Sequence, residues 1–263
     1  MRVATRVRIA GTEIDPVTLG EAVERVAAFV RSDGNQASSV ATINAQFVEL
    51  AHRDPLFAQT LRGFELNVAD GASVVLASRL LGDSLPERVN GVDLMVSLSG
   101  EAARSGFSIY LLGGAPGAAT QTASKLTQDY PGLRIAGIDC PPFGFHEDPA
   151  LDDAVSRRIA ECRPDIVFVA LGAPKQENWI QSHRHLPVKV MIGVGGSFEL
   201  VAGMKKRAPR FIQRLGCEWA WRLVLEPRRL WKRYLVGNSL FIYLVVRQWL
   251  SRRAGTGEIS ESR

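Results

Sequence analysis

Over the first 200 residues, short runs of Val, Ile and Leu alternate with longer stretches in which apolar residues recur at helical spacing. The short runs predict strands and the amphipathic stretches predict helices. Strands are predicted over residues 39–43, 65–69, 107–112, 134–138, 166–171 and 188–194, and helices over 19–31, 72–81, 118–129, 152–161 and 176–183. This alternation is typical of βαβ units, so we expect an α/β fold with a mostly parallel sheet flanked by helices on both faces.

The pattern and the charge both change near residue 202. Residues 1–202 carry 18 basic and 23 acidic side chains, a net charge of −5, whereas residues 203–263 carry 14 and 4, a net charge of +10. We therefore predict an α/β domain over 1–202 and a basic helical C-terminal appendage over 203–263. Within the appendage, residues 235–246 carry no charge. As a helix this run would extend ~18 Å, well short of a ~30 Å hydrocarbon core.

The basic appendage favours an anionic membrane surface as a partner. Basic residues near such a surface contribute ~1 kcal/mol each, and the tryptophans of the segment fit an interfacial belt. A nucleic-acid surface is the competing interpretation, but the acidic first 202 residues and the absence of RNA- or DNA-binding motifs speak against it. A packed helical hairpin with solvated charges is the plainest alternative.

Cysteine and histidine usage gives no sign of a disulfide framework, a cofactor or a metal site. The three cysteines lie far apart, which favours a reducing compartment. The first residues lack the apolar core of a signal peptide, and no apolar run is long enough to span a bilayer. We expect a cytoplasmic protein attached peripherally to the inner face of the membrane. The four histidines lack the spacing of metal ligands, and we expect them at the surface.

Polar residues directly follow the first two predicted strands, where ligands bind in open α/β sheets. Thr42 and Asn44 end the first strand, and either could hydrogen-bond a sugar or pyrophosphate, or simply stabilise a turn. Asp70 follows the second strand. It suits a helix N-cap and also a general base for an acceptor hydroxyl, and the two roles can coexist.

Glycine pairs follow two of the later strands. Gly113-Gly114 and Gly195-Gly196 would let backbone N–H groups approach an anion such as a nucleotide diphosphate, or would only make tight turns. Neither matches a complete dinucleotide fingerprint or a P-loop. Gln176 fits the first turn of a helix, and Arg88 is either a surface charge or a phosphate clamp.

Several short motifs together resemble the WecG/TagA/CpsF glycosyltransferases of bacterial surface-polysaccharide assembly. The resemblance covers residues ~10–234 and most of the motifs follow strand ends. In chain order they are Thr42-Ile43-Asn44-Ala45, Ala69-Asp70-Gly71, residues 87–93 (ERVNGVD), Leu111-Leu112-Gly113-Gly114, residues 171–177 (LGAPKQE), residues 193–198 (GVGGSF), Arg207-Ala208-Pro209 and residues 218–227, with Glu218-Trp219, Arg222-Leu223 and Glu226-Pro227.

The resemblance implies a Rossmann-like catalytic domain that transfers a sugar from a UDP-sugar to an undecaprenyl-diphosphate-linked acceptor, with inversion and without a metal. It implies that Asp70 is the general base and that Thr42, Asn44 and Gln176 line the substrate pocket. Phosphates would be met by Arg88 and by three appendage residues, which are Arg222, Arg229 and Lys232. It also implies that the appendage targets a membrane. The sequence leaves the oligomeric state open, and a homo-oligomer is one alternative because basic appendages often complete a neighbour's site.

Two sequence features bear on the expected chemistry. No D-x-D pair occurs, so backbone amides, arginine and lysine would have to meet the charge of a leaving diphosphate. Glu199 stands where the family usually has Asp, which bears on the sugar transferred: a hexose, an N-acetylhexosamine or a uronic acid.

Two other functions remain open at this point. One is an NAD(P)-dependent oxidoreductase on the same kind of sheet, and the other is a membrane-docked regulator that binds nucleotides without turnover. The missing G-x-G-x-x-G after an early strand disfavours the oxidoreductase.

Overall fold

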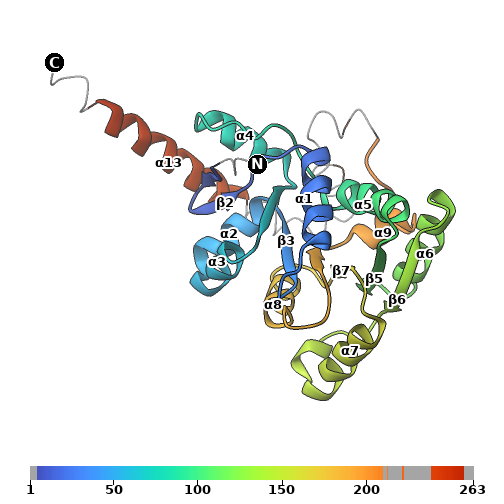
Figure 1. Ribbon diagram of the computed structural model, residues 1–263. Coiled ribbons are helices and arrows are strands. Elements are labelled where there is room, and N and C mark those ends of the chain that lie inside the picture. Colours follow the sequence, from blue (N-terminus) through green and yellow to red (C-terminus); the bar gives the residue numbers. More distant parts are fainter. Residues whose placement is uncertain (1–4, 210–211, 213–220, 222–237, 258–263) are drawn as a thin grey trace.

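The computed structural model describes residues 5–209, 212, 221 and 238–257, and a six-stranded parallel sheet forms its centre (Figure 1). The strands lie in the order β4-β3-β8-β7-β5-β6. Their bounds are β3 Ser38–Ile43, β4 Leu66–Ala69, β5 Ser108–Gly113, β6 Arg134–Asp139, β7 Ile166–Ala170 and β8 Val190–Gly193. Each overlaps a run predicted as a strand, so the expected α/β fold with a parallel sheet is confirmed.

Burial explains why the strands read as apolar runs. All residues of β4, β5, β7 and β8 are buried, and so are all residues of β3 after the first. A parallel sheet covered on both faces requires apolar side chains on both sides of each strand. The edge strand β6 is only partly buried, in keeping with its mixed sequence.

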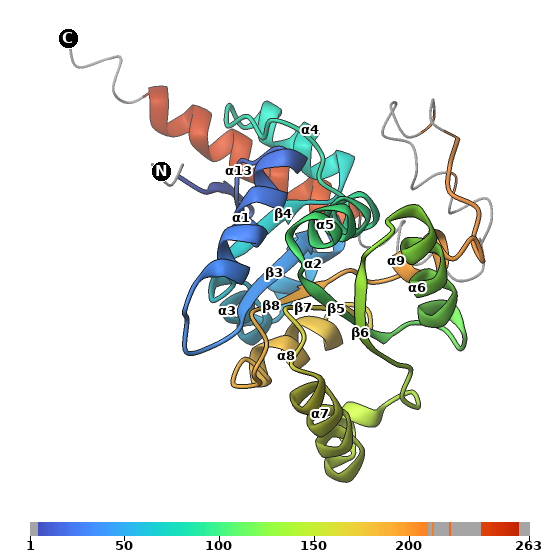
Figure 2. The same cartoon turned by 45° about the vertical axis from the view of Figure 1, so that its right-hand side comes forward.

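Helices cover both faces of the sheet (Figure 2). One core cluster contains side chains of α1 (Leu19–Arg31), α5 (Gly91–Ser105), α6 (Ala118–Asp129) and α9 (Ser197–Val201). The other contains side chains of α2 (Ala45–Arg53), α3 (Pro55–Arg62), α4 (Ala72–Leu80), α7 (Pro149–Cys162) and α8 (Lys175–Ser182). The short 3₁₀ helix η1 (Phe145–Glu147) precedes α7. The five predicted helices are confirmed, and α2, α3, α5 and α9 add to them.

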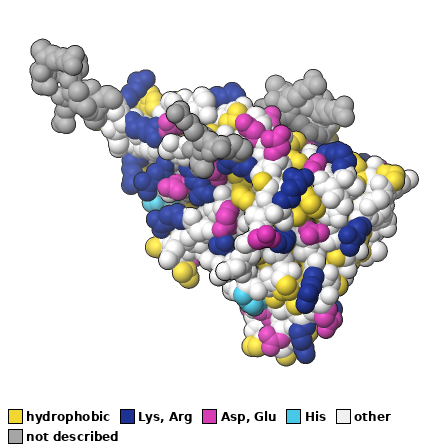
Figure 3. All heavy atoms as spheres, in the orientation of Figure 1, with side chains coloured by type: hydrophobic (Ala, Val, Ile, Leu, Met, Phe, Trp, Pro, Cys, Tyr) yellow, Lys and Arg dark blue, Asp and Glu magenta, His cyan; other side chains and the backbone are white. Residues whose placement is uncertain are grey.

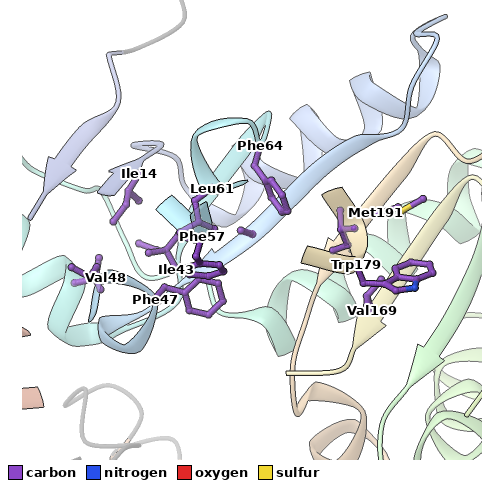
Figure 4. Packing of buried hydrophobic residues seen from close by; sticks show 14 of the residues in the cluster. Ile14, Ile43, Phe47, Val48, Phe57, Leu61, Phe64, Val169, Trp179 and Met191 are labelled. Carbon is purple, nitrogen blue, oxygen red and sulfur yellow. The ribbon is translucent and has the colours of Figure 1, made fainter. Parts of the chain in front are cut away.

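A small hairpin next to β4 was not predicted. It consists of β1 (Val7–Ile9) and β2 (Thr12–Ile14), which pair antiparallel. Directly after it, Asp15 accepts a hydrogen bond from the backbone N–H of Asn67 at 2.8 Å, which attaches the hairpin to β4. Figure 4 shows Ile14 near the aromatic cluster of α2 and α3, where the rings of Phe47 and Phe57 lie 5.8 Å apart.

The expectation that every histidine lies at the surface is wrong for His183. This side chain is 8% exposed, and its ring stacks on Trp179 with the centroids 4.1 Å apart. Its Nε2 lies 3.0 Å from Asp152 Oδ2, so the ring joins α8 to α7. The sequence shows two histidines separated by one residue and gives no sign that an aromatic ring and a carboxylate of another helix enclose one of them.

Helix α13 (Asn238–Gly257) follows the segment that the structure does not describe and packs against α2. Phe241 and Val245 belong to the same core cluster as α2 and α3. The side chain of Gln248 makes two bonds to the β1–β2 turn: its Oε1 accepts from the N–H of Ala10 at 2.6 Å, and its Nε2 donates to the carbonyl of Arg8 at 2.9 Å. The C-terminal helix is therefore docked on the α/β domain.

Within the described residues, no helix has the length and apolar character needed to cross a bilayer. Of the predicted appendage, residues 210–211, 213–220, 222–237 and 258–263 lie outside the described part. The charge-free run predicted over 235–246 continues into the first turns of α13.

We expect Phe241→Ala to lower the free energy of unfolding by about 3 kcal/mol, because a buried aromatic side chain is replaced by a cavity. Urea denaturation followed by circular dichroism measures this change. Ile242→Ala is the matched control, since its side chain is 59% exposed and its loss should change stability by less than about 0.5 kcal/mol. Equal effects of the two substitutions would mean that α13 does not dock as described.

Candidate active site

The register of β3 and β4 places two predicted site residues side by side. Ile43 pairs with Ala69, so the following residues, Asn44 and Asp70, lie at the same edge of the sheet. The backbone N–H of Asp70 donates to the carbonyl of Ile43 at 2.8 Å. Asp70 is half-buried, which puts a carboxylate at the edge where ligands of such sheets bind.

Capping of the next helix does not account for Asp70. Helix α4 has Gly71 at its N-cap, and this residue has no side chain with which to cap the helix. Gly71 also packs closely on the neighbouring strand end, because a Cβ there would lie 3.3 Å from Asn44 Cβ. The N-cap interpretation of Asp70 is therefore wrong, and the general-base interpretation stays a prediction.

Thr42 and Asn44 both stabilise the local backbone. The hydroxyl of Thr42, which is buried, donates to the carbonyl of Gly193 at 3.0 Å and so ties β3 to β8. Asn44 caps α2, and its Oδ1 accepts from the N–H of Gln46 at 3.0 Å. This cap uses the amide oxygen, and the NH₂ group on the same side chain is the part suited to donating to a ligand.

The two glycine pairs differ in what they pack against. Gly113 and Gly114 have φ of +93° and +82°. A Cβ on Gly113 would lie 2.8 Å from Leu171, and one on Gly114 would lie 2.9 Å from Phe198. The tight-turn interpretation therefore accounts for this pair. Gly195 has φ +53°, and a Cβ there would meet nothing within 4 Å in the described structure, so close packing does not account for this glycine.

Gln176 connects the two loops that follow β7 and β8. Its side chain is 2% exposed, and its Oε1 accepts from the N–H of Gly172 at 3.2 Å and from the N–H of Gly195 at 3.0 Å. Its Nε2 donates to Glu177 Oε1 at 2.6 Å. The predicted pocket residue is thus bonded to backbone that ends two neighbouring strands.

Glu177, the next residue in the chain, is a buried carboxyl group to which the sequence assigned no separate role. It is 0% exposed, and burial raises its pKa to about 7 against the lowering effect of the Gln176 hydrogen bond. Its apolar helix neighbour at helical spacing, Ile180, is also buried. That pairing was a signal in the sequence that Glu177 faces inward.

Glu199 lies near the loops that follow β5 and β6. Its Oε2 is buried without a hydrogen-bond partner in the described structure, and a Cβ on Gly196 would lie 3.8 Å from it. Burial raises the pKa of the neighbouring Cys140 thiol, and the negative charges of Asp139 and Glu199 raise it further. Cys140 Sγ donates to the carbonyl of Gly114 at 3.5 Å, so these groups occupy the same end of the strand edge.

Arg88 belongs to a segment held beside Asp70. The N–H of Val89 donates to the carbonyl of Ala69 at 2.8 Å, so the residues on either side of this bond are close in space. A second contact near this edge was not predicted from the sequence. Arg207 forms an ion pair of 2.7 Å with Asp93 in the first turn of α5. This pair holds the chain near the strand edge just before the undescribed segment begins.

The three appendage residues predicted to meet phosphates, Arg222, Arg229 and Lys232, lie outside the described residues. In the part of the chain that is described, no three His, Cys, Asp or Glu side chains gather in a way that could hold a metal ion.

Comparison with known proteins decides the family. Residues 7–255 match the glycosyl transferase WecG/TagA/CpsF family. The chain belongs to this family. An N-acetylglucosaminyldiphosphoundecaprenol N-acetyl-beta-D-mannosaminyltransferase of Bacillus subtilis (strain 168) is 39% identical over 197 residues, 74% of each chain. A Staphylococcus aureus (strain MRSA252) protein of the same name is 31% identical over 243 residues, 92% of each chain.

Membership of the WecG/TagA/CpsF family makes this chain a glycosyltransferase, as the resemblance implied. The nicotinamide-dependent oxidoreductase and the non-enzymatic regulator are therefore set aside. Within the family frame, the strand edge that carries Asn44, Asp70 and Gly195 is the candidate active site.

In this WecG/TagA/CpsF transferase, we expect Gly193→Ala to destabilise the site. The added Cβ would lie 2.7 Å from Gln176 Nε2 and 2.8 Å from Glu177 Oε1, and overpacking of this kind costs about 1–3 kcal/mol. Thermal and urea denaturation measure the change. Gly20→Ala in α1 is the control, since nothing lies within 4 Å of its Cβ, and it should be neutral or stabilising. A neutral Gly193→Ala would contradict the packing around Gln176.

Proposed function

We propose that this glycosyltransferase moves a sugar from a UDP-sugar to an undecaprenyl-diphosphate-linked saccharide in surface-polysaccharide assembly, with inversion and without a metal ion. The names of the relatives support a lipid-linked acceptor and make UDP-N-acetylmannosamine the first donor to test. The absence of a D-x-D pair supports metal independence. Hexoses and uronic acids remain the other donor classes, because Glu199 stands where the family usually has Asp.

The observation that carries the proposal is the position of Asp70. Its carboxylate follows β4 at the strand edge, beside Asn44, and Gly71 rather than Asp70 occupies the N-cap of the next helix. In the proposed step, Asp70 takes the proton of the acceptor hydroxyl as that oxygen attacks C1 of the sugar from the face opposite UDP. The bond between C1 and the diphosphate oxygen breaks, and UDP leaves with the electron pair.

Backbone amides and basic side chains would stabilise the departing diphosphate. The loop after β8 is a candidate, since a Cβ on Gly195 would meet nothing within 4 Å in the described structure, but the N–H of Gly195 itself already donates to Gln176 Oε1. The Val89–Ala69 hydrogen bond brings the backbone of Arg88 close to Asp70. We assign the same electrostatic role to Arg222, Arg229 and Lys232 on the sequence alone. Preorganised donors of this kind are the main source of stabilisation where charge develops in the transition state.

We further propose that α13 binds an anionic membrane surface. Opposite its docked face, the helix exposes four apolar side chains, which are Ile242, Tyr243, Val246 and Leu250. Arg247 and Arg253 are exposed on the same helix, and Lys and Arg side chains gather over this end of the molecule (Figure 3). An apolar stripe bordered by arginine is typical of an interfacial helix.

We expect Asp70→Asn to reduce kcat by about 10²–10⁴-fold, the usual contribution of a general base, while UDP still binds. The assay is UDP release from a panel of UDP-sugars in EDTA, with and without a short-chain prenyl-diphosphate-saccharide acceptor, and UDP binding is measured by calorimetry. Asp33→Asn is the control, because Asp33 is fully exposed in a loop. Near-normal turnover in Asp70→Asn would remove Asp70 as the base.

A triple variant that replaces Ile242, Val246 and Leu250 with Ser should lose membrane binding without losing the fold. We expect its partition onto phosphatidylglycerol-containing vesicles to fall at least about tenfold, because the apolar area available for insertion is removed. Cosedimentation measures the partition. Leu151→Ser is the control, since Leu151 is exposed on α7, at the opposite end of the molecule (Figure 1). Unchanged binding of the triple variant would refute this docking face.

A further inference from the structure

A buried carboxyl group with unused bonding capacity lies beneath the candidate site. Glu177 is 0% exposed, its Oε1 accepts from Gln176 Nε2 at 2.6 Å, and its Oε2 has no hydrogen-bond partner among the described residues. Burying a carboxyl group without full hydrogen bonding is unfavourable. A group of this kind in a native structure calls for a compensating role.

The complete burial of Glu177 excludes it as the general base. A general base must reach the acceptor hydroxyl within hydrogen-bond distance, and Glu177 has no exposed surface through which a substrate could touch it. Any effect of Glu177 on transfer must therefore pass through the residues that contact it.

The contact that matters is the side-chain amide of Gln176. This amide can adopt two orientations, which differ by an exchange of its oxygen and its nitrogen. In the observed orientation, Oε1 accepts from two backbone N–H groups, those of Gly172 and Gly195. In the opposite orientation, NH₂ would face both N–H groups and both bonds would be lost. Glu177 Oε1 can accept a hydrogen bond from Gln176 only when the NH₂ group of Gln176 faces it, which is the observed orientation.

The two backbone N–H groups belong to neighbouring loops. Gly172 follows β7 and Gly195 follows β8, and these strands pair directly. We infer that Glu177 is a positioning residue that fixes the orientation of the Gln176 amide and, through it, the geometry of the two loops that bind the donor diphosphate. The donor assignment in this inference rests on the proposed function, whereas the loop geometry does not.

The test uses the full chain and reads the loops without any ligand. Glu177→Leu removes the acceptor of the Gln176 NH₂ group. We expect the amides of Gly172 and Gly195 to exchange with deuterium at least about tenfold faster, because the free energy of local opening falls by about 1.4 kcal/mol when their hydrogen bonds to Gln176 are weakened. Glu177→Gln keeps an acceptor oxygen and should preserve most of the protection. NMR exchange measurements resolve the two glycines.

The reciprocal double variant Q176E/E177Q reverses the direction of the side-chain hydrogen bond. The new carboxylate at position 176 can accept from both backbone N–H groups, and the new amide at position 177 can donate to it. We expect the double variant to recover the slow exchange that Q176E alone loses, since Q176E places two carboxyl groups in contact. If Glu177→Leu does not fold, this pair decides: fast exchange in a folded double variant would overturn the inference.

Asp165→Asn is the matched control for a general loss of stability. Asp165 accepts from the N–H and the hydroxyl of Ser108 at 2.7 and 2.8 Å, at the opposite, amino-terminal edge of the sheet. It should destabilise the fold without selectively affecting exchange at Gly172 and Gly195. Equal selective effects of Glu177→Leu and Asp165→Asn, or exchange in folded Glu177→Leu within about twofold of wild type, would refute positioning by Glu177.

Measurements of kcat, KM and UDP binding distinguish a failure of this inference from a failure of the proposed function. If both hold, Glu177→Leu raises KM for the UDP-sugar about tenfold while kcat changes less than about threefold, because the loops bind the donor rather than move the proton. If the wild-type protein does not bind UDP but the exchange results are as expected, the proposed function fails and positioning stands. A fall in kcat alone would contradict positioning of the donor loops.

Discussion

Hydrogen bonds between parallel strands determine which strand ends lie side by side, and every part of the candidate site depends on them. Ile43 pairs with Ala69, which places Asn44 beside Asp70, and Val169 pairs with Gly193, which places the loops after β7 and β8 together. Residues that are up to 151 positions apart in the chain, such as Thr42 and Gly193, are thereby brought to one edge. A local change in register would move each of these side chains away from its partner.

The strand ends are held in place by buried polar groups, and this arrangement has an energetic cost. Thr42 bonds to the carbonyl of Gly193, and the Gln176–Glu177 pair packs against the same glycine. Because burial raises the pKa of Glu177 to about 7, the folded state disfavours its ionised form. The stability that Glu177 contributes as a neutral group is lost as pH rises from the unfolded-state value toward 7 and above. Well-packed apolar side chains in place of Gln176 and Glu177 would avoid that cost, but they could not orient the N–H groups of Gly172 and Gly195.

Much of this arrangement is predictable from the sequence, because the fold follows from apolar periodicity. The six strands and the positions of Asp70, Gly113 and Gly195 at strand ends needed only the pattern of buried runs and turns. Predictions failed where a side chain depends on a distant partner. His183 is buried because Trp179 and Asp152 enclose it, and the strand-end glycines differ because only one pair packs against Leu171 and Phe198. The docking of α13 on α2 likewise depends on a complementary surface that no local pattern reveals.

The ends of the undescribed segment place a geometric limit on the appendage residues. The Arg207–Asp93 ion pair fixes the chain at the first turn of α5, and Phe241 fixes it again in the core beside α2. From Pro209 to Arg222 the chain can extend at most about 45 Å, whatever its conformation. This length is compatible with phosphate contacts by Arg222, Arg229 and Lys232 in the site of their own chain, and the roles of these three residues stay predictions.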